Sequence, residues 1–165
     1  MPKVGFNPYK IKDSIVEIYT VPYKGASQVI LIDLKDLVKV RTYRWFVNQK
    51  GYVRSSKLRK FLHCHILDYP GKQVDHKNSD KLDNRRCNLR LVTNQQNSWN
   101  KPKAYKGSKS GYKGVAYNKR DDNWRAVLSL NGVRHELGRF KTPLEAHKAY
   151  VSKSLELHGE YSPYH

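Results

Sequence analysis

Residues 73–97 constrain the fold of this chain more than any other segment. A short apolar approach leads to Asp75 and His76, and a loop rich in Asn, Asp and Ser follows. Side chains of these types bond to nearby backbone groups, so the loop is expected to fold back on itself. The β-branched run 89–93 predicts a strand, and Asn94 is an acceptable residue to open a helix. The segment therefore predicts a strand, a loop, a second strand and a helix.

Three side chains of this segment, Asp75, His76 and Asn97, are expected to come within reach of one another. Hard divalent cations such as Mg²⁺ prefer oxygen ligands, which makes the carboxylate and the carboxamide candidate ligands. An imidazole has an ordinary pKa of about 6.5 and can deprotonate water near neutral pH. A bound ion would stabilise the charge that develops on a phosphate. The trio thus indicates phosphodiester hydrolysis.

The same residues resemble an HNH endonuclease with its ββα-metal finger. The resemblance rests on Val74-Asp75-His76, the run Leu-Asp-Asn-Arg-Arg at 82–86, Asn88-Leu89-Arg90 and Asn97. It implies that His76 is the general base and that Asp75 and Asn97 bind one Mg²⁺ or Mn²⁺ ion per active site. It also implies that Asn88 holds the loop and helps to aim the imidazole. An ordinary surface loop is the alternative, because all these residue types are common in turns.

A second histidine, His63, lies in the apolar segment 61–67, where HNH proteins often have a His-Arg pair. By position it matches an auxiliary catalytic residue, although Cys64 occupies the place of the arginine. The alternative is a packed core histidine. His63, Cys64, His65 and Cys87 could also form a zinc site, but their spacing is not that of zinc fingers. Two cysteines fit a reducing compartment without structural disulfides.

Charge indicates a polyanionic partner. The chain carries 32 Lys and Arg against 14 acidic residues, for a net charge of +18. The stretches 37–67 and 84–120 contain no acidic residue. Such tracts repel themselves unless a phosphate backbone lies against them, so double-stranded DNA is the expected partner, with a solvated charged face as the alternative. The candidate contacts in this half of the chain are Arg54, Arg59, Lys60, Arg85, Arg86 and Arg90.

No segment predicts membrane insertion or export. The longest apolar run, 29–32, is too short to span a bilayer, and no apolar signal segment follows Met1. We therefore expect a protein that is not secreted and lies in the cytoplasm of an infected or host bacterial cell.

Residues 1–99 are expected to form a β-rich nuclease domain, with the ββα-metal motif at 61–100. Residues 1–13 contain two prolines and predict a loosely held arm. Runs 14–21 and 27–34, separated by a turn at 22–25, predict a hairpin. Asp33 or Asp36 is expected to cap a short helix running toward Arg44. Runs 45–47 and 52–54 predict a second hairpin.

Residues 100–111 form a basic linker, in which Lys101, Lys103 and Lys106 are expected to follow the phosphates of one strand. Beyond it, residues 112–165 predict a three-stranded antiparallel sheet packed on one helix. The strands are expected at 112–118, 123–130 and 133–140, and Asn-Gly at 131–132 is a strong hairpin signal. Thr142, followed three residues later by Glu145, predicts the start of the helix.

This last region resembles the DNA-binding domain of plant ethylene-response factors (the Apetala type), which also occurs behind HNH nucleases in phage. The resemblance rests on residues 110–115, Trp124-Arg125-Ala126, 137–140 and Glu145-Ala146. It implies that the open face of the sheet enters the major groove. Trp124 and Tyr117 are expected to pack under the helix. The implied contacts are Lys113, Asn118, Arg125, Ser129 and Arg134. Ala116, Asn118 and Glu136 depart from the plant pattern, so its base preference does not transfer.

The combined prediction is an α+β, site-specific homing endonuclease of the phage HNH type. One active site per chain predicts a nick, with the protein acting as a monomer or as a homodimer on DNA. One alternative is a DNA-binding regulator with an inactive HNH site. Another is an RNA-binding protein that recognises shape through its basic tracts.

Overall fold

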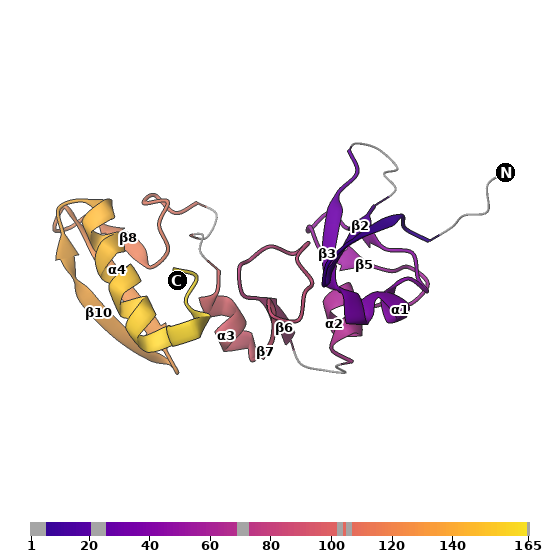
Figure 1. Ribbon diagram of the computed structural model, residues 1–165. Helices are drawn as coiled ribbons and strands as arrows, with labels where there is room; N and C mark the ends of the chain where they lie inside the picture. Colours follow the sequence, from indigo (N-terminus) through magenta and orange to yellow (C-terminus); the bar gives the residue numbers. More distant parts are fainter. Residues whose placement is uncertain (1–5, 21–25, 69–72, 102–103, 105–106, 165) are drawn as a thin grey trace. The chain divides into compact units, whose positions relative to one another are not determined.

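Two compact units, residues 1–94 and 95–165, make up the chain, and each contains helices and small sheets. The computed structural model describes residues 6–20, 26–68, 73–101, 104 and 107–164. The predicted turn at 22–25 and two predicted DNA contacts, Lys103 and Lys106, lie outside them. Mixed helical and strand structure agrees with the expected class (Figure 1). Within the described ranges, no helix is both long enough and apolar enough to cross a membrane.

The amino-terminal unit begins with an antiparallel sheet in the order β1-β2-β3, formed by β1 (Tyr9–Lys12), β2 (Ile15–Tyr19) and β3 (Val29–Asp33). Alternate residues of β2 and β3 are apolar and buried, which gives this sheet one core face. The predicted loose arm is wrong for β1, which pairs with β2 along its whole length. All four β1 residues are exposed, and the strand is held on β2 by backbone pairing and by the ion pair between Lys12 and Glu17.

Short elements complete the core of this unit around Trp45, which is 1% exposed. They are the 3-10 helix η1 (Leu34–Asp36), α1 (Leu37–Val40), the predicted hairpin of β4 (Phe46–Val47) and β5 (Val53–Arg54), and α2 (Leu62–Ile66). The short helix after β3 is present as expected, but neither Asp33 nor Asp36 caps it with its side chain. Both carboxylates bind Arg86 instead.

Residues 73–97 fold in the predicted order of strand, loop, strand and helix. β6 (Gln73–His76) pairs antiparallel with β7 (Leu89–Val92), and α3 (Asn94–Trp99) follows after one residue. Residues 77–88, here called the motif loop, dock on the edge of β3. The Leu31 N–H donates to the Leu82 carbonyl (2.9 Å), and the Asn84 N–H donates to the Leu31 carbonyl (2.8 Å). The loop thereby extends the first sheet by one short parallel bridge.

The carboxy-terminal unit has the predicted sheet and helix, in strand order β10-β9-β8. Its elements are β8 (Val115–Asn118), β9 (Asn123–Leu130), β10 (Val133–Phe140), α4 (Pro143–His158) and the 3-10 helix η2 (Gly159–Tyr161). Helix α4, drawn in yellow, lies across the sheet (Figure 1). Thr142 and Glu145 form the expected capping box. The first strand starts three residues later than expected, after Gly114, whose φ is +71°. A Cβ there would overlap the Tyr150 ring.

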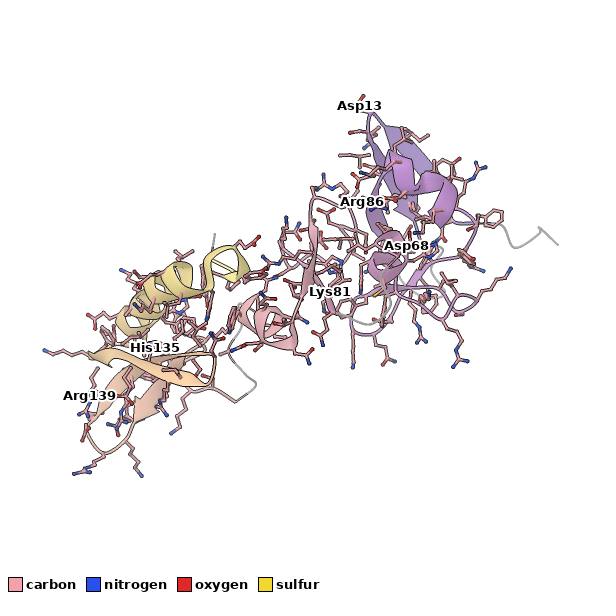
Figure 2. The ribbon with its side chains drawn as sticks, turned by 90° about the horizontal axis from the view of Figure 1, so that it is seen from below. Asp13, Asp68, Lys81, Arg86, His135 and Arg139 are labelled. Carbon is pink, nitrogen blue, oxygen red and sulfur yellow. The ribbon has the colours of Figure 1, made fainter. Side chains whose placement is uncertain are left out.

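Arg86 joins the motif loop to the amino-terminal core. Its guanidinium donates two hydrogen bonds of 2.8 Å to the buried Asp36 carboxylate and one to the Ile66 carbonyl of α2. Its backbone N–H donates to Asp33 (2.8 Å). Figure 2 shows Arg86 among the side chains of this unit. A residue predicted to contact DNA therefore has its charge compensated inside the protein.

Replacing Arg86 with Met should lower the free energy of unfolding of the amino-terminal unit by about 3 kcal/mol, because it leaves the Asp36 charge buried without its partner. Adding Asp36→Asn should recover much of that loss. Hydrogen exchange of β2 and β3 amides measures the change in this unit alone. Unchanged protection together with weaker DNA binding would instead make Arg86 a phosphate contact.

Candidate active site

Strand β6 carries Asp75 and His76 in a buried setting, with 8% and 4% of their surfaces exposed. Neighbouring residues of a strand point to opposite faces, so the two side chains meet different partners. In the β6–β7 register Asp75 lies opposite Arg90, and His76 lies opposite Leu89. The two side chains are thus held independently.

Asp75 forms an ion pair with Arg90 whose side chains are both almost fully covered, at 9% and 8% exposed. The Arg90 Nε and Nη2 atoms both donate to the same oxygen, Asp75 Oδ2, at 3.0 and 2.8 Å. Breaking a buried pair of this kind is costly, because one charge would remain without compensation. Arg90 therefore fixes the Asp75 carboxylate in the protein.

His76 is contacted by two aromatic rings and by one side-chain amide. The His63 ring meets it edge to face at 5.1 Å between centroids, and Tyr52 lies at 6.3 Å. Its Nε2 atom is 3.4 Å from Asn84 Oδ1. Burial lowers the pKa of His76 below the ordinary 6.5, against the opposing effect of Asn84 and the nearby carboxylates. The imidazole is consequently neutral near neutral pH, the state that a proton acceptor requires.

Asn84 determines which nitrogen of that imidazole carries the proton. This residue is fully buried, and its Nδ2 donates to the carbonyls of Lys81 and Leu82, each at 3.1 Å. The amide oxygen must then face His76, so Nε2–H is the donor and Nδ1 carries the lone pair. Sequence reasoning missed this role. The available signal was the position of Asn84 within the run Leu-Asp-Asn-Arg-Arg.

Asn88 holds the motif loop closed. Its Oδ1 accepts a hydrogen bond from the Asn78 N–H (3.0 Å), and its Nδ2 donates to the Asp83 carbonyl (2.8 Å). The Lys77 N–H also donates to the Asn88 carbonyl (2.9 Å). The bonds to Lys77 and Asn78 join the two ends of the loop, and the bond to Asp83 ties Asn88 to its middle. The carboxamide that contacts the imidazole is that of Asn84.

His63 lies beside His76 and is 5% exposed. Phe61 stacks on its ring at 5.4 Å, and Tyr52 packs at 5.8 Å. Burial, followed by the neighbouring His76, lowers the pKa of His63 to about 4, so this ring is neutral too. Its Nδ1 has no hydrogen-bond partner in the part of the chain that the structure describes. The structure thus brings His63 and His76 together.

Asn97, the other predicted metal ligand, lies on α3, which the fold groups with the second unit from Gln95 onward. Within the described ranges no cluster of three or more His, Cys, Asp or Glu side chains could hold a metal ion, which leaves the zinc alternative unsupported. The proposed donors are of another kind, one carboxylate and one carboxamide. Their oxygen atoms suit a hard cation that keeps most of its water.

The predicted phosphate contacts of the first unit fall into two groups. Arg85 binds Asp83 through bonds of 2.7 Å, and Arg86 and Arg90 are paired as described above. Arg59 and Lys60 are exposed, and Arg54 is half-buried with its guanidinium over the Phe61 ring at 5.9 Å. Lys101 is exposed in the second unit. Three of the six predicted contacts of the first unit, Arg85, Arg86 and Arg90, are therefore engaged in ion pairs within the protein.

The predicted contacts on the second sheet share one face, with one exception. Cross-strand register puts Arg125 opposite Arg139 and Ser129 opposite Arg134, on the side away from α4, where Figure 2 shows Arg139. Asn118 lies on the same face and donates to Asp121 (2.7 Å). The exception is Lys113, whose ammonium donates to the carbonyls of Ser98 (3.0 Å) and Trp99 (2.8 Å).

Residues 67–99, which include β6, the motif loop, β7 and α3, match the family model described as HNH endonuclease. That model ends before the second sheet, so the resemblance of the second sheet and its helix to ethylene-response factors stays a prediction. No solved structure matches the chain.

Two viral proteins are similar over longer stretches. Protein 3.8 of Escherichia phage T7 is 33% identical over 92 residues, which cover 56% of this chain and 74% of that protein. The uncharacterized HNH endonuclease L560 of Acanthamoeba polyphaga mimivirus is 32% identical over 162 residues, which cover 92% of this chain and 82% of that protein. With the buried Asp75-His76 pair and the loop that orients it, this similarity shows that the chain belongs to the HNH endonuclease family.

Proposed function

We propose that this chain is a metal-dependent endonuclease that hydrolyses a phosphodiester bond of double-stranded DNA, of the homing type. The observation that carries the proposal is the neutral, buried imidazole of His76, oriented by Asn84 beside the anchored carboxylate of Asp75. One active site per chain would nick one strand. A double-strand break would then need a second subunit or a second binding event.

His76 is the proposed general base. With Nε2–H donated to Asn84, Nδ1 takes the proton of the attacking water. The imidazolium that forms is stabilised by the Asn84 carboxamide oxygen and by the nearby carboxylates, whose effect on the pKa of His76 opposes the larger, lowering effect of burial. Asn88 keeps the motif loop closed, so that Asn84 stays in place. His63 remains neutral and buttresses the His76 ring.

Asp75 and Asn97 are the proposed ligands of a single Mg²⁺ or Mn²⁺ ion. When bound, such an ion stabilises the charge on the phosphate and on the leaving oxygen. The contribution of the chain is to hold the ligands still. Arg90 supplies that constraint for Asp75, since two donors fix one carboxylate oxygen.

The second unit is proposed to select the site, as a DNA-binding domain of the ethylene-response-factor type. Its sheet presents one face away from α4, with Asn118, Arg125, Ser129 and Arg134 on it, and an antiparallel sheet of this size fits the major groove. Arg125 and Arg139 both lie near Asp121, at 4.0 and 2.9 Å. DNA binding would therefore exchange protein carboxylates for phosphates on this face.

The second candidate function is a DNA-binding regulator with an inactive site. The ion pair between Arg90 and Asp75 favours it, because Arg90 competes for a carboxylate that the metal would need. The two functions differ in one outcome. A regulator would retard DNA without cutting it.

Incubation of supercoiled plasmid with the protein and Mg²⁺ or Mn²⁺ should convert it to open circles, and chelation of the metal should stop the conversion. His76→Ala should reduce the rate by about 100-fold or more while leaving DNA affinity unchanged, because it removes the base and no phosphate contact. Cys87→Ala, an exposed change on the same loop, is the control and should cut normally. Retardation without open circles for the wild-type protein would support the regulator.

The acidic limb of the single-turnover rate should lie below pH 6.5, because burial lowers the pKa of His76 and only the neutral imidazole accepts a proton. Asn84→Asp should move that limb to higher pH, since a carboxylate in contact with the ring stabilises the imidazolium. Rates measured from about pH 5 to about pH 8 test both statements. A wild-type limb above pH 6.5 would contradict the lowered pKa of His76, and an unmoved limb in Asn84→Asp would contradict the contact between the imidazole and residue 84.

A further inference from the structure

Helix α3 is short, with six residues, and none of them is buried. A helix this short is marginal in water and takes its stability from tertiary contacts. Since α3 carries Asn97, whatever anchors this helix also sets the position of the Asn97 backbone.

Lys113 anchors the end of α3. Its Nζ atom donates to the carbonyls of Ser98 and Trp99, the last two residues of the helix. Terminal carbonyls lack partners within a helix and carry its partial negative charge, so a cation bonded there satisfies both. Burial lowers the pKa of Lys113 to about 8, with a smaller effect from Lys101. Most of the ammonium therefore stays protonated near neutral pH.

A second contact holds the same end of the helix. The Trp99 ring stacks on His158 of α4, with centroids 4.4 Å apart and planes 8° apart. His158 is 4% exposed, and its Nδ1 is 3.1 Å from Ser154 Oγ, which in turn is 3.0 Å from Ser162 Oγ. This buried chain of hydrogen bonds fixes the plane of the imidazole. Trp99 therefore stacks on an imidazole whose orientation is already fixed.

We propose that Lys113 and His158, here called the α3 clamp, are positioning residues that orient α3 and thereby hold Asn97 as a metal ligand. This inference rests on the proposed function only for the role of Asn97. The clamp itself rests on two independent contacts, one polar and one aromatic.

The competing role for Lys113 is the phosphate contact that its position in the resemblance implies. A phosphate contact needs an exposed, mobile ammonium, whereas this one is half-buried and bonded to two carbonyls. The two roles predict different effects of replacing Lys113. Loss of a phosphate contact weakens DNA binding, and loss of the clamp weakens metal binding.

The test compares Lys113→Met with Lys148→Met, which removes the same charge from an exposed position on α4. Binding of Mn²⁺ to the full chain is followed by electron paramagnetic resonance of the free ion. Removing a group that orients a ligand typically weakens metal affinity about 10- to 100-fold. We expect at least a tenfold loss for Lys113→Met, no change for Lys148→Met, and partial recovery in Lys113→Arg. Trp99→Leu removes the stack from the other side and should behave like Lys113→Met.

Plasmid nicking gives the second readout. In Lys113→Met the half-saturating metal concentration should rise by about tenfold, while the rate at saturating metal and the DNA affinity without metal stay near wild type. Weaker DNA binding with an unchanged metal requirement would overturn the clamp and restore the phosphate contact. Wild-type protein that binds Mn²⁺ yet never nicks would sink the proposed endonuclease but not the clamp. Unchanged Mn²⁺ affinity in Lys113→Met would sink the clamp alone.

Discussion

The burial of the Asn84 carboxamide is the constraint on which the site depends. A buried amide must satisfy its donors, and two backbone carbonyls take both of them. The oxygen is left to face the imidazole, so the tautomer of His76 follows from the folding of a loop. That loop in turn is held on β3 by the backbone of Leu31 and by Arg86. A strand far from the motif in sequence thus helps to determine which ring nitrogen of His76 carries the lone pair.

Charge in this molecule has two distinct uses. The three arginines of the motif each form an ion pair with an aspartate. Arg85 binds Asp83 within the motif loop, Arg86 ties that loop to Asp36 of the core, and Arg90 fixes the Asp75 carboxylate. Such pairs give orientation more than stability, because desolvation offsets most of their attraction. The net charge of +18 is left to residues elsewhere, on surfaces where a phosphate backbone would replace water and counterions.

The order of elements was predictable because turn formers, alternation and capping residues act locally. The strand-loop-strand-helix order at 73–99, the hairpins and the capping box of Thr142 all follow from neighbours in sequence. Strand β1 was not predicted, since its four residues are exposed and it joins β2 through backbone pairing and the surface ion pair between Lys12 and Glu17. The partners of Arg86 and Lys113 were equally hidden, because they lie 50 and about 15 residues away and no local rule connects them. The residue types showed that Arg86 and Lys113 are cations, but tertiary packing determines which groups they bind.

The contacts that attach α3 to the carboxy-terminal unit bear on where this chain could be recombined with another protein. The basic segment that starts at residue 100 looks like the natural place to exchange one targeting module for another. Helix α3 lies before that junction, and Lys113 and His158 lie after it. A chimera spliced there would part the helix from both of its supports. Recombination that keeps the proposed metal ligand should retain α3 and should transplant a lysine and an aromatic ring to support it along with the new module.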